Sequence, residues 1–257
     1  MTCRKALLFG LNYVNDPSCR LDGCINDANN VRSLLVDHLG YQADDIMMCT
    51  DSTPIKPTKV MMQRLLRELV LSTHRLQINQ IFISYSGHGM NVGTEQKDNA
   101  IVPVDFRSNG VITDYELAAL IRQVHPRTDV IMLMDACHSG SMCNLPYVYS
   151  VDKFVQDESL SVSCRALLVS GCRDDQVSQE ADLDGDKRET GMATDAFINA
   201  ISENNYDVTC VNLIMYMNAY MQKHNFPQRP QLSSSRMLSE TCIFVSSAED
   251  GRPFFCL

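Results

Sequence analysis

The sequence contains no Cys-x-x-Cys pair, although it has eleven cysteines. Zinc ribbons and thioredoxin-like redox motifs both need two cysteines at that spacing, so both are excluded. The cysteine count is odd and the spacings form no disulfide framework, which favours a reducing compartment. We therefore expect a cytoplasmic protein in which most cysteines are small core hydrophobes.

Segments that would direct the chain to a membrane or divide it are also lacking. The first five residues lead into only a short apolar run, unlike a signal peptide, and no run approaches transmembrane length. The C-terminal Cys256-Leu257 lacks the spacing of a prenylation box. No repeat, linker-like stretch or low-complexity segment interrupts the 257 residues. These absences predict a single domain over residues 1–257 with no membrane partner.

Clustered positive charge is missing as well. The chain carries 22 Lys and Arg residues against 31 Asp and Glu, a net charge of −9 at pH 7. Nucleic-acid binding needs a concentrated basic surface, so no nucleic-acid partner is expected. A net negative charge usually serves solubility alone. The alternative is that it favours cationic substrates.

What the chain does contain is an alternation of strand-like and helix-like segments. Strands are predicted over residues 5–10, 46–49, 80–84, 100–104, 130–134, 165–170, 230–232 and 242–245. Helices are predicted over residues 25–39, 59–73, 114–124, 191–202 and 209–223, with Thr58 and Asp114 as N-caps of the second and third. Residues 141–163 read as irregular and polar. This alternation predicts an α/β fold with a mostly parallel sheet and helices on both faces.

Two short strings follow the most apolar of these strands. Tyr85-Ser-Gly-His-Gly89 follows residues 80–84, and Asp135-Ala-Cys-His-Ser-Gly140 follows residues 130–134. Strands that are apolar at nearly every position are typical of a parallel sheet covered on both faces, and ligands bind beyond the carboxyl ends of such strands. His88 and Cys137 are therefore expected at the same rim, as a cysteine nucleophile and its base.

The residues around this pair suit acyl transfer. An imidazolium beside a thiol favours the thiolate, and the same imidazole can later protonate the departing amine. The backbone N–H groups of Gly89 and Cys137 can face the developing oxyanion. His138 is the rival imidazole, but adjacent side chains on an extended segment point to opposite sides. The alternative, a core cysteine and an unrelated histidine, does not explain why both occupy glycine-rich turns after buried strands.

The chain resembles a metacaspase, within the caspase-like cysteine peptidases. The strings that carry the resemblance, besides those at His88 and Cys137, are Gly23-Cys-Ile-Asn-Asp27, Leu145-Pro-Tyr-Val-Tyr-Ser150, Ser170-Gly-Cys-Arg-Asp-Asp-Gln176 and Pro230-Gln-Leu-Ser-Ser234. The resemblance implies a caspase-like three-layer sandwich with about six strands in its central sheet. It also implies a large-subunit-like region over residues 1–150, a joining loop over 151–163 and a small-subunit-like region over 164–257. The arrangement is similar to type I, without an N-terminal prodomain.

The resemblance also implies an acidic substrate pocket. Asp135 stands where caspases have glutamine, and with Asp27, Cys24 and Ser86 it would hold the residue before the cleaved bond. Paired carboxylates suit Arg or Lys through charge-assisted hydrogen bonds. Protein or peptide substrates cleaved after Arg or Lys are therefore expected. For Asp27 the alternative is an exposed acid at a helix start, stabilised by the helix dipole.

Calcium control, common among metacaspases, is expected to be weak or absent. Of the four acidic positions of the family's calcium site, Asp98 and Asp114 are present, whereas Tyr115 and Asn144 occupy the other two. Calcium takes about six to eight oxygen ligands, so the loss of two carboxylates weakens such a site. The chemistry itself requires no cofactor. The acidic stretch at residues 182–186 lacks the spacing and the Glu of an EF-hand, and reads as a solvated turn.

Other properties of the family leave alternatives open. Lys153 is a candidate for self-cleavage between the two regions, or a solvated loop residue. A monomer is expected, because metacaspases usually remain monomeric. A paracaspase-like, Arg-specific peptidase and a non-proteolytic caspase-like scaffold are the competing hypotheses.

Overall fold

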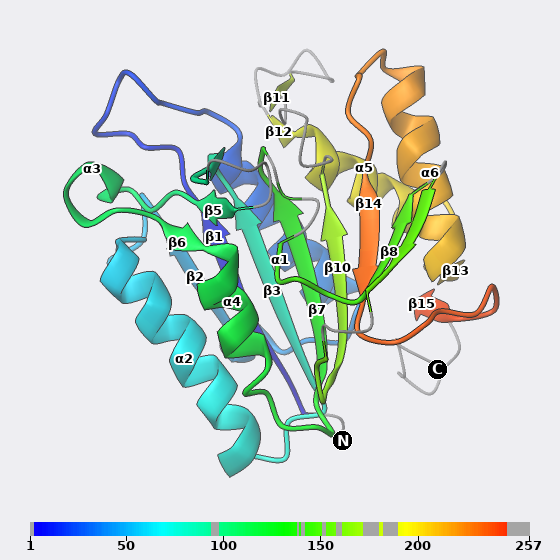
Figure 1. The fold of residues 1–257 in the computed structure, drawn as a ribbon. Coiled ribbons are helices and arrows are strands. Elements are labelled where there is room, and N and C mark those ends of the chain that lie inside the picture. Colours follow the sequence, from blue (N-terminus) through cyan, green and yellow to red (C-terminus); the bar gives the residue numbers. More distant parts are fainter. Residues whose placement is uncertain are drawn as a thin grey trace.

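The computed structural model describes residues 3–93, 98–137, 139, 142–150, 153–157, 161–171, 180–181 and 190–245. Its centre is an eight-stranded sheet in the order β2-β1-β3-β7-β10-β14-β8-β9 (Figure 1). In that order the strands are Ile46–Thr50, Arg4–Gly10, Gln80–Ser86, Asp129–Asp135, Arg165–Ser170, Gln231–Ser234, Tyr147–Ser150 and Lys153–Gln156. The first five run parallel, and the remaining neighbours pair antiparallel. The predicted α/β class is confirmed.

Helices cover both faces of this sheet and give three layers (Figure 1). Helices α1 (Cys24–Asp37), α5 (Met192–Ser202) and α6 (Cys210–Lys223) lie on one face, and α2 (Lys59–Arg75) and α4 (Asp114–Ile121) lie on the other. Every residue of β3 and β7 is buried, because alternate side chains enter opposite cores. Phe82 and Ile131 pack in the core beneath α1 and α5, whereas Ile81 and Val130 pack in the core beneath α2 and α4.

The sheet is larger than the roughly six strands expected for this architecture. Residues 141–163, read as irregular, contain the hairpin of β8 and β9, so that reading is wrong in part. The two strands lie at the edge of the sheet, and Phe154 is 51% exposed. Tyr149 packs on Phe154 across the hairpin, with ring centroids 5.1 Å apart. Strands at the edge of a sheet are not buried on both faces, so they need no continuous apolar run. The hydrophobic pattern therefore did not indicate this hairpin.

Smaller elements complete the described fold. A three-stranded sheet contains β4 (Gly89–Asn91), β5 (Asn99–Ile101) and β6 (Ile112–Thr113), and α3 (Phe106–Asn109) lies between the last two. Two-stranded sheets pair β11 (Glu180–Ala181) with β12 (Thr190–Gly191) and β13 (Val208–Thr209) with β15 (Ile243–Val245). A 3₁₀ helix, η1 (Ala43–Asp45), precedes β2. The strand expected at 242–245 therefore exists, but it lies outside the central sheet. None of the helices among the described residues is both long and apolar enough to cross a membrane.

The capping contacts of two helices differ from the predictions, although α2 begins at Lys59 after Thr58 as expected. Thr113, not Asp114, is the N-cap of α4: its Oγ1 accepts from the Glu116 N–H (3.3 Å), while Glu116 Oε2 accepts from the Thr113 N–H (2.8 Å). Asp114 is the first helical residue and is fully buried. Thr58 precedes α2 but makes no capping bond with its side chain; the N–H of Lys59 donates to Asp105 Oδ1 instead (2.8 Å). An N-cap threonine with Glu three residues later forms a capping box. Because Thr113 and Glu116 do this here, the Asp114 side chain is not needed as the cap.

Candidate active site

The two strings singled out in the sequence follow neighbouring strands of the central sheet. Strands β3 and β7 pair in parallel with Ser86 opposite Asp135, so His88 and Cys137 each lie two residues beyond a matched position. The N–H of Gly87 donates to the Asp135 carbonyl oxygen (3.2 Å) and extends the pairing past the strand ends. The structure therefore brings both strings to one rim, at the carboxyl ends of parallel strands.

Gly89 lies directly against the second string. A Cβ atom at this position would collide with the carbonyl oxygen of Cys137, so only glycine lets the two backbones approach this closely. Cys137 is half-buried at this point. His138 lies outside the described residues.

Most of the other described cysteines lie in the core, as expected. Burial raises the pKa of Cys49 and of Cys143 to about 12 and that of Cys164 to about 11. Such thiols remain protonated at neutral pH and are poor nucleophiles. The half-buried Cys137 at the rim lies in a different environment from these three.

Two buried tyrosines fix the backbone of His88. The His88 N–H donates to Tyr13 Oη (3.0 Å), and the Tyr85 hydroxyl donates to the His88 carbonyl oxygen (2.7 Å). Tyr13 in turn donates to the Val102 carbonyl oxygen (2.7 Å), and its ring lies 4.8 Å from the imidazole, centroid to centroid. Burial raises the pKa of both phenols, which keeps them neutral and able to donate. The sequence analysis missed both roles, although Tyr85 lies within the His88 string.

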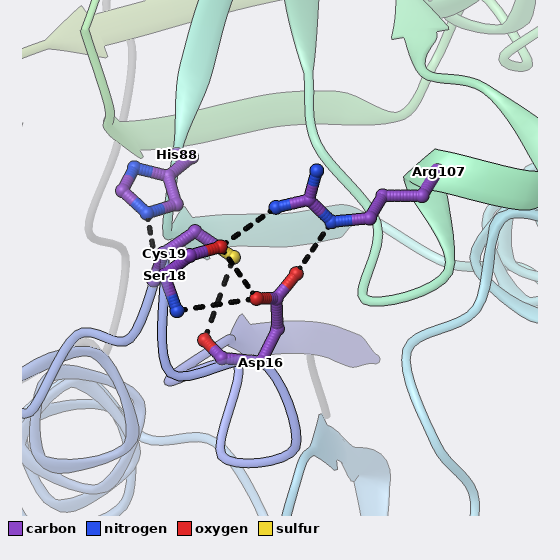
Figure 2. A network of polar contacts seen from close by, with 5 residues as sticks. All are labelled: Asp16, Ser18, Cys19, His88 and Arg107. Atoms are coloured by element: carbon purple, nitrogen blue, oxygen red, sulfur yellow. Dashed lines mark hydrogen bonds and ion pairs between the residues drawn. The ribbon is translucent and has the colours of Figure 1, made fainter.

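The imidazole of His88 has a defined partner. Its Nε2 atom lies 2.7 Å from the carbonyl oxygen of Cys19, in the loop between β1 and α1 (Figure 2). A carbonyl oxygen only accepts hydrogen bonds, so this contact requires the proton of a neutral imidazole to be on Nε2. Nδ1 is then the nitrogen with a free lone pair, the form that a general base needs.

The two predicted pocket carboxylates meet at the same rim. The Ser86 hydroxyl donates to Asp27 Oδ2 (2.5 Å), and the Gly191 N–H donates to Asp27 Oδ1 (2.9 Å). The N–H of Thr194, in the first turn of α5, donates to Asp135 Oδ2 (2.8 Å). A Cβ atom on Gly191 would lie within 2.6 Å of Asp135 Oδ2 and of Asp27 Oδ2, so the two carboxylates lie together against this glycine. The structure thus brings Asp27, Asp135 and Ser86 together.

Burial excludes one of the two interpretations of Asp27. Its exposed fraction is 1%, and that of Asp135 is 4%, so the reading of Asp27 as an exposed helix-start acid is wrong. Cys24 is buried one turn before Asp27 on α1. Gly191 and Thr194 were missed by sequence reasoning, because their donors are backbone N–H groups with no residue-type signature. The N-terminus of α5 also favours negative charge at this point.

Asp98, Asp114, Tyr115 and Asn144 form a separate cluster beside the three-stranded sheet. Burial, with a smaller contribution from the charge of Asp98, raises the pKa of the Asp114 carboxyl. The charges of Asp98 and Asp114 raise the pKa of Tyr115. The Asn144 side-chain N–H donates to Asp114 Oδ2 (3.5 Å). The structure therefore gathers the four positions named from the sequence.

These residues do not fit a calcium ion. Within the part of the chain that the structure describes, no group of three or more His, Cys, Asp or Glu side chains could hold a metal. The cluster has two carboxylates, and the Asn144 amide and the Tyr115 hydroxyl bring hydrogen-bond donors to them. Calcium needs a shell made of oxygen acceptors, several of them charged.

The last predicted site residue lies in the edge strand of the central sheet, four strands from β7. Lys153 is the first residue of β9 and pairs with Ser150 in the edge hairpin. The acidic stretch at residues 182–186 lies outside the described residues.

Comparison with known sequences identifies the family. Residues 4–146 match the family model described as metacaspase, peptidase C14 domain. The chain is 31% identical over 305 residues to metacaspase-1 of Eremothecium gossypii, which covers 94% of this chain and 66% of that protein. It is also 31% identical over 301 residues to metacaspase-1 of Scheffersomyces stipitis, covering 94% of this chain and 73% of that protein. The chain thus spans about two thirds of the length of the first of these relatives.

Solved structures show the same fold at lower identity. A protein of Geobacter sulfurreducens superimposes with a TM-score of 0.65 at 20% identity, covering 93% of this chain and 95% of that one. Caspase-1 of Spodoptera frugiperda superimposes with a TM-score of 0.52 at 10% identity, covering 93% and 88%. The three-layer fold is therefore that of the caspases. Together with the family match over residues 4–146, this places the chain in the metacaspase family of cysteine-type endopeptidases.

Proposed function

We propose that this chain hydrolyses peptide bonds after Arg or Lys, with Cys137 as nucleophile and His88 as base and acid. The observation that carries the proposal is the parallel register of β3 and β7, which places the two residues at equivalent positions beyond matched strand ends. The contact of His88 Nε2 with the Cys19 carbonyl oxygen supports it further, because it leaves Nδ1 as the basic nitrogen.

The proposed reaction proceeds through a thioester. Nδ1 of His88 takes the proton of the Cys137 thiol, and the thiolate forms a bond to the carbonyl carbon of the substrate. The carbonyl oxygen becomes an oxyanion, which the N–H groups of Gly89 and Cys137 stabilise. When the C–N bond breaks, the proton on Nδ1 passes to the leaving amine. Water then attacks the thioester, gives a proton to His88, and releases the carboxylic acid and the Cys137 thiol.

The preference for Arg or Lys rests on the Asp27 and Asp135 pair. Both carboxylates are buried at the rim that carries Cys137, and the donors that reach them from Ser86, Gly191 and Thr194 are neutral. A guanidinium or ammonium group would meet two negative charges there and gain charge-assisted hydrogen bonds. An acidic side chain would be repelled, so cleavage after Asp, the caspase preference, is not expected.

Labelling tests the chemistry and a peptide library tests the specificity. An Arg-based irreversible inhibitor of cysteine peptidases should modify the wild-type chain once and should leave Cys137→Ala unmodified. A positional peptide library should show cleavage after Arg and Lys. Modification of Cys137→Ala to the same extent, or faster turnover of peptides that end in Asp, would overturn the proposal. A non-proteolytic scaffold would give neither labelling nor cleavage.

We also propose that calcium has little or no effect on this activity. Two carboxylates accompanied by a phenol and an amide do not supply the ligands that calcium needs. Peptide turnover should be the same in a chelator and in millimolar calcium. Activity that disappears with the chelator and returns with micromolar calcium would contradict this.

Three properties of the whole protein belong to the same proposal. It acts as a monomer, it is cytoplasmic, and it cuts itself at Lys153 between the two regions of the fold. Lys153 lies in an edge hairpin, which another copy of the protein can approach. Intact mass after incubation, compared between the wild type and Cys137→Ala, tests the self-cleavage.

A further inference from the structure

The carbonyl that contacts the catalytic imidazole belongs to a surface loop. Cys19 lies between β1 and α1, in a segment with two successive turns: the Asp16 N–H donates to the Tyr13 carbonyl oxygen (2.8 Å), and the Cys19 N–H donates to that of Asp16 (3.1 Å). The position of the Cys19 carbonyl oxygen therefore depends on how the turn at Asp16 is held. Surface turns of this kind are among the more mobile parts of a fold.

One arginine from a distant part of the chain holds this turn (Figure 2). Arg107 in α3 places Nε 2.7 Å from Asp16 Oδ2 and Nη2 2.8 Å from Ser18 Oγ. The Ser18 hydroxyl donates to Asp16 Oδ1 (2.7 Å), so the guanidinium closes a ring of hydrogen bonds with both side chains. The hydrogen bond from Arg107, and next that from Ser18, hold the pKa of the Asp16 carboxyl well below its usual range. Asp16 is therefore ionised at any working pH.

The exposure of this contact argues against a role in overall stability. The Arg107 side chain is 60% exposed and that of Asp16 is 27% exposed. Exposed ion pairs contribute little to the free energy of unfolding, because water screens them and both side chains lose freedom. Two hydrogen bonds in a fork do, however, fix the orientation of the groups that they join. The consequence of the contact is therefore local, at the turn that presents the Cys19 carbonyl oxygen.

We propose that Arg107 is a positioning residue for His88. Its fork on Asp16 and Ser18 holds the turn so that the Cys19 carbonyl oxygen meets Nε2 of His88, which keeps the proton on Nε2 and the lone pair on Nδ1. The proposal rests on the proposed role of His88 as the base. Arg107 contacts neither substrate nor the reacting atoms in this account, so its loss affects the rate of the proton transfer and not the binding of the substrate.

Kinetics of Arg107→Ala and a matched control form the first test. We expect kcat for an Arg peptide to fall about tenfold with KM unchanged, since small misplacements of a catalytic group cost rate. Arg107→Lys keeps one donor for Asp16 and should recover part of the loss. Arg20→Ala is the control: Arg20 pairs with Asp22 (3.0 Å) in the same loop and is 57% exposed. It should retain wild-type kcat.

The tautomer of His88 gives the second test, independent of turnover. In ¹⁵N-labelled protein, with the signals assigned by comparison with His88→Ala, the neutral imidazole should show Nε2 protonated in the wild type and in Arg20→Ala. A mixture of tautomers is expected in Arg107→Ala. The same kcat in Arg107→Ala and the wild type, an unchanged tautomer, or an equal loss in Arg20→Ala would overturn the proposal. If the wild type neither cleaves nor reacts with the inhibitor, the proposed function fails instead, and the tautomer measurement still reports on the contact.

Discussion

The protein contains two pairs of aspartates whose surroundings differ. Asp27 and Asp135 lie together against Gly191 at the rim with Cys137, where a serine hydroxyl and backbone N–H groups donate to them. Asp98 and Asp114 lie beside the three-stranded sheet, where Tyr115 and Asn144 occupy the neighbouring positions. Neutral donors from the backbone and from the Ser86 hydroxyl reach the first pair. In the second pair, the side chains of Asn144 and Tyr115 donate hydrogen bonds at the positions where a metal site would have two further carboxylates.

This difference indicates what each pair can bind. Backbone N–H and hydroxyl groups that donate to a carboxylate favour its charged form, so we propose that the first pair attracts a cation. In the second pair burial and mutual charge favour the protonated form of Asp114, which lowers the attraction for a cation. We therefore propose that the first pair forms the specificity pocket and that the second has a structural role. The following changes test this contrast.

The largest effect is expected from neutralising the first pair. Asp135→Asn should lower kcat/KM for Arg peptides about 100-fold or more, because a buried cation in the pocket would lose half of its countercharge. Asp98→Asn, the matched change in the second pair, should alter the same kcat/KM less than about twofold, within the usual range for groups that do not touch substrate. The reverse ranking of the two variants would show that the pocket has been assigned to the wrong pair.

The next effect is a gain of function in the second pair. Tyr115→Asp combined with Asn144→Asp gives the cluster four carboxylates in place of two, and these can serve as the charged oxygen ligands of a calcium ion. Calorimetry should detect calcium binding in the double variant and none in the wild type. Both the double variant and its reference protein should also carry Lys153→Ala, so that self-cleavage contributes no heat to the measurement. Binding of equal strength before and after the double change would contradict the account of the cluster.

A smaller change removes one donor from the first pair. Ser86→Ala deletes the hydroxyl that lies 2.5 Å from Asp27 Oδ2 and leaves the charge in place. We expect kcat/KM for Arg peptides to fall about tenfold, because a hydrogen bond to a charged group contributes about 1.5 kcal/mol or more. The ratio between Arg and Lys peptides should change as well, because the carboxylate is free to rotate. An unchanged ratio would mean that Ser86 does not orient Asp27.

The smallest effect concerns stability and pH. The pKa of Asp114 is raised in the folded state, so the proton is held more tightly there than in the unfolded chain, and the resulting stabilisation is lost as pH rises through the raised pKa. Asp114→Asn cannot ionise and avoids this loss. Its Tm should exceed that of the wild type by about 2 °C at pH 7, and the difference should vanish at acidic pH. A Tm difference between Asp114→Asn and the wild type that grows toward acidic pH would contradict a raised pKa of Asp114.

The hydrophobic pattern was sufficient to predict the centre of the sheet but not its edge. Strands β3 and β7 are buried on both faces, so their residues are apolar and the strands are evident. Strands β8 and β9 lie at the edge, where Tyr147-Val-Tyr-Ser150 stays only half-buried, and they were read as part of an irregular segment. The N-cap of α4 was misplaced by one residue, because Thr113 and Asp114 are both good caps and only the fold selects between them.

The sequence by itself determined the class of the fold and the family, and it predicted the pairing of Cys137 with His88, since these depend on burial period and on short strings of fixed residue types. Only the tertiary structure decided that Asp27 is buried, that Tyr13 and Tyr85 hold His88, and that Arg107 holds the turn of Cys19. The physical reason is that most of these contacts join residues far apart in the sequence, by 75 positions for Tyr13 and His88 and by 91 for Asp16 and Arg107. Many of them use backbone N–H or C=O groups, which have no residue-type signature. No pattern along the chain encodes such contacts, because the packing of the three layers creates them.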